Sequence, residues 1–150
     1  MSSTDEAMSA ALALAREAAV AGEIPVGALV LGATGERLGA GRNRREETTD
    51  PTAHAEIVAL REAAKATGSW NLSGTTLVVT MEPCVMCAGA ILQSRVTRVI
   101  FGAWDDKAGA AGSLYDVLRD RRLPYRAEVI GGVREGEAVA LLQEFFATRR

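Results

Sequence analysis

Two spacings of apolar residues predict the elements of this chain. From Thr4 to Ala21 apolar residues recur every three or four positions, which predicts a helix that ends at Gly22. Runs of β-branched and aliphatic residues between glycine-containing turns predict strands. The expected strands cover residues 26–31, 36–41, 75–80, 97–101 and 126–130, and the expected later helices cover residues 53–66, 83–92, 113–118 and the segment around 141–146.

The alternation of these elements predicts the fold class. Helices that alternate with strands along a chain pack on the faces of the sheet that the strands form. We therefore expect an α/β protein, a three-layer α/β/α sandwich around a mixed five-stranded sheet, with residues 1–150 as a single domain. The chain has 48% hydrophobic and 24% charged residues, which fits one core of ordinary size.

The charge balance restricts the partners of the protein. A formal net charge of −2 provides no general basic field, so any contact with nucleic acid has to be local. Arg119, Arg121 and Arg122 form a basic cluster, which we interpret as a solvated face. The apolar stretches are far shorter than the roughly 20 residues of a membrane span. The first residues also lack the pattern of a secretory signal, so we expect a cytoplasmic protein with no membrane partner.

The cysteines and the histidine suggest a metal site. Cys84 and Cys87 follow Pro83 at a spacing that places both sulfurs on one face of a helix N-terminus, where thiolates are favoured. Two adjacent thiolates favour a cation, and zinc accepts cysteine sulfur together with histidine nitrogen. Because His54 is the single histidine, we predict that His54, Cys84 and Cys87 are the zinc ligands.

Three protein ligands favour a catalytic zinc, since a structural zinc normally has four. Asp50 is the alternative as a fourth ligand. A catalytic zinc lowers the pKa of a bound water from about 15.7 towards about 7, and Glu56, two residues after His54, is placed to carry the proton. Thiol redox chemistry is the other interpretation of Cys-x-x-Cys, but the accompanying His-x-Glu motif, 26 residues before Pro83, disfavours it.

These two motifs, His54-Ala-Glu56 and Pro83-Cys-Val-Met-Cys87, resemble the signature of zinc-dependent nucleobase deaminases. The chain is also similar to bacterial tRNA-specific adenosine deaminases over almost its whole length. The segments that carry this resemblance are Glu23–Ala28, Asp50–Ile57, Glu82–Ala90, Phe101–Ala103, Lys107–Leu114 and Phe145–Arg150. The last two point to the tRNA-acting branch, and the resemblance implies the cytidine deaminase-like version of the fold.

The resemblance implies hydrolytic deamination of adenosine to inosine at the wobble position of a tRNA anticodon, with release of ammonia. It assigns His54, Cys84 and Cys87 to one Zn²⁺ per subunit of a homodimer and Glu56 to proton transfer. The implied partner is an anticodon stem-loop, that of an arginine tRNA with adenosine at the wobble position.

The same resemblance implies the substrate contacts. Asn43 would hydrogen-bond the flipped base, Val26 would pack against it, and the backbone N–H of Ala55 would read a ring position. The residues expected to contact flanking nucleotides are Asp105, Lys107, Phe145, Phe146, Arg149 and Arg150. The alternatives are a turn role for Asn43 and a packing role for the two phenylalanines.

Two competing functions use parts of the same pattern. A deaminase of free guanine, cytosine or a nucleotide would need the same zinc and the same Glu56, and the terminal segment shared with the tRNA-acting branch argues against it. A non-catalytic zinc module, acting as a partner subunit or scaffold, would not need the Glu56 carboxylate, which this chain has.

Overall fold

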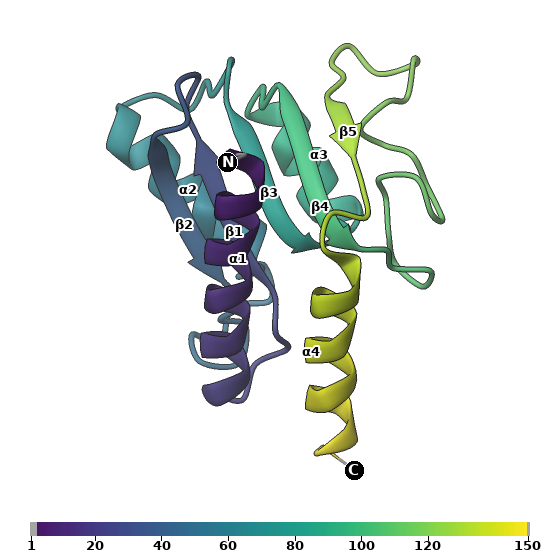
Figure 1. Cartoon of the computed structure of the whole chain (residues 1–150). Helices are drawn as coiled ribbons and strands as arrows, with labels where there is room; N and C mark the ends of the chain where they lie inside the picture. Colours follow the sequence, from purple (N-terminus) through teal and green to yellow (C-terminus); the bar gives the residue numbers. More distant parts are fainter. Residues whose placement is uncertain (1–2, 150) are drawn as a thin grey trace.

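Helices cover both faces of a central sheet (Figure 1). The structure is a computed structural model that describes residues 3–149. Within that range it has the following helices and strands: α1 (Ser3–Val20), β1 (Gly27–Leu31), β2 (Arg37–Arg42), α2 (Ala55–Thr67), β3 (Thr76–Met81), α3 (Val85–Gln93), β4 (Arg98–Ala103), β5 (Glu128–Ile130) and α4 (Glu135–Ala147). The predicted three-layer α/β/α sandwich with a mixed sheet is thereby confirmed.

The strand directions bring several strand ends to one edge of the sheet. The order is β2-β1-β3-β4-β5, in which β1 is antiparallel to both β2 and β3, while β3, β4 and β5 are parallel. The carboxyl ends of β2, β3 and β4 therefore share an edge with the start of β1. Loops and helices that follow these strands meet there.

Alternate residues of the strands build two separate apolar layers. Val30, Val79 and Phe101 point to the face that α2 and α3 cover. Leu29, Val78 and Ile100 point to the opposite face, where they pack against α1 residues such as Leu12 and against α4. The central strands β1, β3 and β4 are thus buried on both sides, which explains their nearly continuous aliphatic sequences.

Two glycines in β2 allow α2 to lie directly on the sheet. A Cβ atom at Gly41 would come within 2.5 Å of the Ala55 carbonyl oxygen, and one at Gly39 would come within 2.5 Å of the Ala59 carbonyl oxygen. Since such distances are far inside van der Waals contact, only glycine permits this approach. The contact fixes the first turn of α2 relative to the end of β2.

The five predicted strands are confirmed, with small shifts of their ends, but the predicted helix over residues 113–118 is wrong. This segment is a tight loop, in which the Ala111 and Ser113 N–H groups donate to the buried carboxylate of Glu82. Gly112 has a φ of +134°, which a helix does not allow. The N–H of Tyr115 donates to the Gly109 carbonyl at 3.1 Å and that of Val117 donates to the Ala110 carbonyl at 2.8 Å, so these groups do not make the hydrogen bonds of a helix to the carbonyl four residues earlier.

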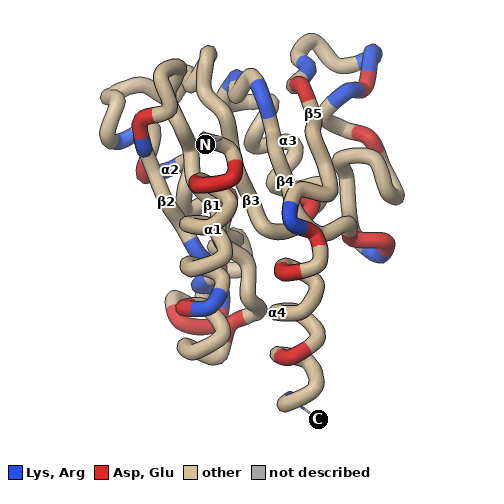
Figure 2. The backbone as a smooth tube through the Cα atoms, in the orientation of Figure 1, with Lys and Arg blue, Asp and Glu red and all other residues tan. Residues whose placement is uncertain are grey.

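Charged residues of both signs are interspersed over the molecule (Figure 2). In the predicted basic cluster, Arg119 pairs with Asp116 at 2.9 Å and Arg122 pairs with Asp120 at 2.7 Å. All three arginines of the cluster are exposed, which confirms its interpretation as a solvated face. Among residues 3–149 no helix combines the length and apolar character that crossing a bilayer requires.

Candidate active site

The site lies at the sheet edge where β2, β3 and β4 end. A loop leads from β2 to the start of α2, which carries His54 and Glu56, and a short turn leads from β3 to the start of α3, which carries the cysteines. Asp105 follows the end of β4 at the same edge. Residues from three separate segments of the chain are thereby placed around one point.

The side chains of His54, Cys84 and Cys87 form a compact group. Their ligand atoms all lie within 4.8 Å of one another, and no other such group of three occurs in the described part of the chain. His54 Nδ1 is 3.6 Å from Cys84 Sγ and 3.5 Å from Cys87 Sγ. His54 and Cys84 are the N-cap residues of α2 and α3, and Cys87 is buried within the first turn of α3.

This geometry fits zinc. Zn–S bonds of about 2.3 Å and Zn–N bonds of about 2.0–2.1 Å at tetrahedral angles place sulfur and nitrogen about 3.6 Å apart. The sulfur–nitrogen distances given above agree with that value. Asp50, the alternative fourth ligand, is not part of the group. Its Oδ1 accepts hydrogen bonds from the N–H of Thr52 at 2.8 Å and from the Thr52 hydroxyl at 2.7 Å.

The pKa values of the two cysteines are shifted in opposite directions. A hydrogen bond from the Cys87 thiol lowers the pKa of Cys84 to about 4, and a weaker contribution comes from His54. The same hydrogen bond, together with burial, raises the pKa of Cys87 well above its usual range. The Cys84 thiolate in turn raises the pKa of His54. Metal binding at this group would therefore release the proton that Cys87 holds.

Glu56 is a buried carboxyl group beside the ligand group. Its side chain lies in the first turn of α2 and is 4% exposed. Burial raises the pKa of Glu56 to about 7, against the opposing effect of a backbone N–H. A carboxyl group with a pKa near neutrality both accepts and donates a proton at physiological pH.

A pocket of about 220 Å³ opens in front of these residues. The predicted site residues that line it are Val26, Asn43, His54, Ala55, Glu56, Cys84, Asp105 and Phe146. Cys87 lies behind the pocket wall, where it contacts His54. The structure therefore brings two of the predicted metal ligands, the predicted proton carrier and the predicted base contacts Val26, Asn43 and Ala55 into one cavity, with the third ligand, Cys87, in contact with His54.

Asn43 both lines the pocket and shapes the loop after β2. Its Oδ1 accepts a hydrogen bond from the Arg45 N–H at 3.0 Å, and its Nδ2 donates to the Ile24 carbonyl at 3.4 Å. The turn role is therefore present in the structure. The predicted contact between the Asn43 side chain and a base stays a prediction.

Other predicted contacts lie outside this pocket. Lys107 is exposed on the loop after β4. Phe145 and Arg149 line a different hollow, between the carboxyl-terminal ends of α1 and α4, where the guanidinium carbon of Arg149 is 4.5 Å from the Phe145 ring centre. Arg150 lies outside the described residues. The two neighbouring phenylalanines of α4 thus have different surroundings.

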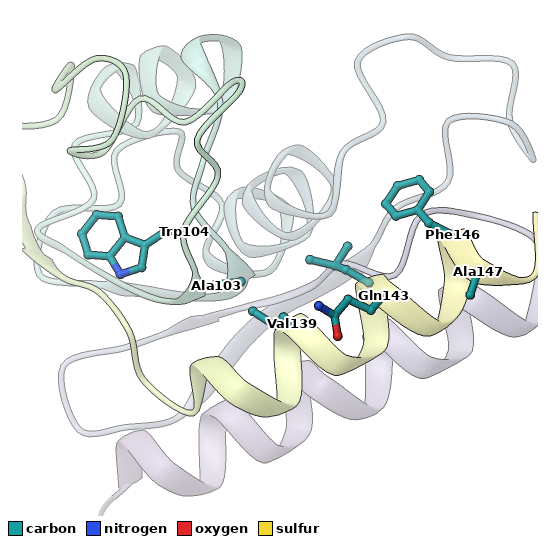
Figure 3. Close-up of a pocket in the computed structure, with 7 residues that line it drawn as sticks. Ala103, Trp104, Val139, Gln143, Phe146 and Ala147 are labelled. Carbon is teal, nitrogen blue, oxygen red and sulfur yellow. The ribbon is translucent and has the colours of Figure 1, made fainter.

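Several pocket residues were not predicted from the sequence. Ile24, Arg45, Met81, Glu82, Ala108 and Leu142 also line the pocket. Leu142 and Phe146 separate it from a wider hollow of about 510 Å³. Figure 3 shows Val139, Gln143 and Phe146 along α4 on one side of that hollow, with Trp104 beyond Ala103 on the other. Ile24, Glu82 and Ala108 lie within segments that carry the family resemblance, whereas Leu142 is marked by no motif and reaches the pocket through the packing of α4 beside β4.

Known proteins share this arrangement of motifs. The family model described as cytidine and deoxycytidylate deaminase zinc-binding region matches residues 1–103. The tRNA-specific adenosine deaminase of Bacillus subtilis is 46% identical over 143 residues, which are 95% of this chain and 88% of that protein. The tRNA(Ile)-lysidine synthase of Deinococcus radiodurans is 53% identical over 144 residues, 96% of this chain. The chain spans only about a quarter of the length of that relative.

The fold agrees with these matches. A solved chain from a study of A-to-I editing by tRNA:A34 deaminases superposes with a TM-score of 0.88 at 38% identity, over 91% of this chain and 99% of that one. The site motifs, the sheet topology and the similarity over nearly the full length of the Bacillus protein agree with one another. The chain therefore belongs to the cytidine and deoxycytidylate deaminase family, within its group of tRNA-specific adenosine deaminases.

Proposed function

We propose that this protein deaminates adenosine to inosine at the wobble position of a tRNA anticodon, consuming water and releasing ammonia. One observation carries the proposal: His54, Cys84 and the Glu56 carboxyl group line one pocket of about 220 Å³, and Cys87 completes the metal-binding group with His54 and Cys84. This volume suits a single nucleobase, and the group pairs a metal-binding set with a proton carrier. The similarity to tRNA-specific adenosine deaminases favours adenosine as the base.

We assign His54 Nδ1 and the two cysteine sulfurs to one zinc ion per chain. When bound there, zinc would supply a nucleophile for C6 of adenine by lowering the pKa of a coordinated water. Glu56 would accept a proton from the attacking water and deliver protons to ring N1 and to the departing amino group. Its pKa of about 7 suits both directions of transfer.

The remaining pocket residues hold the base. Val26 packs against the ring, Asn43 hydrogen-bonds its edge, and the N–H of Ala55 reads a ring position from the N-terminus of α2. Ala55 is suited to that role because the first N–H groups of a helix have no partner within the helix. The pocket excludes water from the face of the ring through Ile24, Val26 and Leu142.

Several features support RNA over a free base. The pocket adjoins the wider hollow with two partly exposed aromatic rings, Trp104 and Phe146, which suit stacking with neighbouring nucleotides. Arg45 at the pocket and the exposed Lys107 on the loop after β4 supply local positive charge for phosphates. An adenosine within a stem is stacked and out of reach, whereas the anticodon loop presents it unpaired. We propose the anticodon stem-loop of an arginine tRNA as the partner.

We further propose that residues 1–150 form a single deaminase domain that works as a homodimer in the cytoplasm. A hollow of about 250 Å³ between α2 and α3, lined by Leu60, Leu72 and Trp70, supports a second copy as its cover. Trp70 is 64% exposed in the single chain. Light scattering tests this assembly, and a monomeric mass at working concentration would contradict it.

The function is tested by nucleoside mass analysis. Purified protein is incubated with unmodified tRNA whose anticodon begins with adenosine, and in parallel with free adenosine, cytidine, cytosine and guanine. We expect inosine from the tRNA alone, confined to the wobble position. Conversion of a free base with untouched tRNA would overturn the substrate, and absence of any product from zinc-loaded protein would favour the scaffold alternative.

A further inference from the structure

Glu82 is a buried carboxylate for which the proposed mechanism has no use. It lies in the turn between β3 and α3, two residues before Cys84, and is 3% exposed. Its Oε1 accepts a hydrogen bond from the Asp105 N–H at 2.9 Å. Its Oε2 accepts two more, from the N–H groups of Ala111 and Ser113, each at 3.0 Å. A buried charge bonded in this way holds its donors firmly.

The loop after β4 is shaped around this carboxylate. A Cβ atom at Gly109 would overlap Glu82 Oε1, so the loop approaches the carboxylate with glycine at that position. The Asp105 carbonyl accepts hydrogen bonds from the Gly109 N–H at 2.9 Å and from the Ser113 hydroxyl at 2.7 Å. Both backbone groups of Asp105 are therefore fixed by a network that centres on Glu82.

The same network joins the loop to the metal-binding helix. The Ala110 N–H donates to the Pro83 carbonyl at 2.8 Å, and Gly109 pairs with Cys84 in an isolated β-bridge. Cys84 and Asp105 both line the pocket. Through Glu82, the position of Asp105 is set by the segment that also presents the Cys84 sulfur.

We propose that Glu82 is a positioning residue of the deaminase, which holds Asp105 in place for contact with the RNA and fixes it relative to the metal-binding helix. The proposal rests on the proposed function, because it takes Asp105 as a substrate contact. Glu82 also lines the pocket, but both of its carboxylate oxygens accept hydrogen bonds from the loop backbone, so its role is to position the loop.

The test variant is Glu82→Gln, which keeps the shape but removes the charge. The new amide group is itself a donor, so it cannot satisfy all three backbone N–H groups. We expect the KM for the tRNA substrate to rise about 10-fold or more, while kcat at saturation changes less than about threefold and zinc content stays unchanged. An unchanged KM, or a loss of zinc, would overturn the proposal.

A double-variant cycle separates positioning from general stability. If Glu82 acts through Asp105, the Glu82→Gln, Asp105→Ala double variant has the same KM as Asp105→Ala alone. Additive effects on KM would contradict the proposal. Glu36→Gln is the matched control, since the Glu36 carboxylate also accepts a backbone N–H, from Thr34 at 3.0 Å, but in the β1–β2 hairpin. We expect this control to leave KM unchanged.

Amide hydrogen exchange tests the same idea without turnover. In Glu82→Gln the amides of Asp105, Ala111 and Ser113 should exchange at least about 10-fold faster than in the parent protein. The amides of Glu46 and Glu47, which donate to the buried carboxylate of Glu23 at 3.0 Å and 2.7 Å, should not change. Equal exchange rates would contradict the proposal. Because exchange does not depend on a substrate, it is decisive even if the parent protein leaves tRNA untouched, which would refute the proposed function alone. If Glu82→Gln does not fold, Glu82→Asp is measured, with the same direction of change expected.

Discussion

The two helices that face each other across the pocket, α2 and α4, are held very differently. Both have 13 residues. In α2 the buried residues are Ala55, Glu56, Ala59, Leu60 and Ala63, whereas α4 has Ala138 alone. The helix with the chemical groups is thus packed rigidly onto the sheet, and the helix that forms the outer wall is largely exposed. Precise geometry is needed where bonds change, and an exposed wall suits a large and variable substrate.

The largest expected effect is the loss of zinc binding when a ligand is removed. Cys87→Ala removes a buried sulfur that lies 3.5 Å from His54 Nδ1. We expect zinc content, measured by atomic emission, to fall to background and deamination to fall with it. Val85→Ala, an exposed position in the same helix, serves as the control and should keep both. Full zinc content in Cys87→Ala would show that the ligand set is wrong.

The next effect separates metal binding from proton transfer. Glu56→Gln keeps the size of the side chain but cannot carry the proton. We expect kcat to fall by about 10²–10⁴-fold, with zinc content and substrate affinity retained. Single-turnover assays with a defined stem-loop measure this loss. If activity is retained, the proton carrier is another group.

Because α2 is packed tightly and α4 is not, a glycine-to-alanine substitution should have a different effect on stability at each helix. Gly41→Ala forces a Cβ atom against the backbone of α2, and we expect a loss of about 1–3 kcal/mol in the free energy of unfolding. Gly136→Ala in α4 has open space around the new atom, and we expect no loss, or a gain of up to about 1 kcal/mol. Urea denaturation of both variants measures the difference. Equal destabilisation by Gly41→Ala and Gly136→Ala would contradict the conclusion that α2 is packed rigidly on the sheet.

The smallest effects distinguish the two phenylalanines of α4. Phe146 lines the pocket and is 53% exposed, so Phe146→Ala should raise the KM for tRNA by roughly 5- to 10-fold through lost stacking, at little cost in stability. Phe145 lines the hollow beside α1, so Phe145→Ala should lower the melting temperature and leave KM nearly unchanged. Identical KM changes in both variants would show that both phenylalanine rings of α4 contact the RNA.

The catalytic end of this molecule could be predicted from the sequence because its signals are local. The ligand pair Cys84 and Cys87 lies on one helical turn, and His54 with Glu56 lies on another. The outer wall was predicted only in part: the family resemblance pointed to Phe146, but Leu142 was not expected, since it reaches the pocket only through the packing of α4. Arg45, in the loop after β2, was not expected either. The expected helix over residues 113–118 is absent for a related reason: the N–H groups of Tyr115 and Val117 donate to the carbonyls of Gly109 and Ala110, in the preceding loop, and not to carbonyls four residues earlier.

The positions of the helix ends determine where the protein can be tethered to a surface. α1 begins at the edge opposite the pocket, where Thr4 lies beside Leu31 and Thr76. The carboxyl-terminal end of α4, which includes Phe146, extends beyond the sheet (Figure 1). An immobilisation tag ahead of α1 therefore leaves the pocket open to a macromolecule in solution. The same tag after α4 would crowd the outer wall, so binding measured on a chip depends on which end is attached.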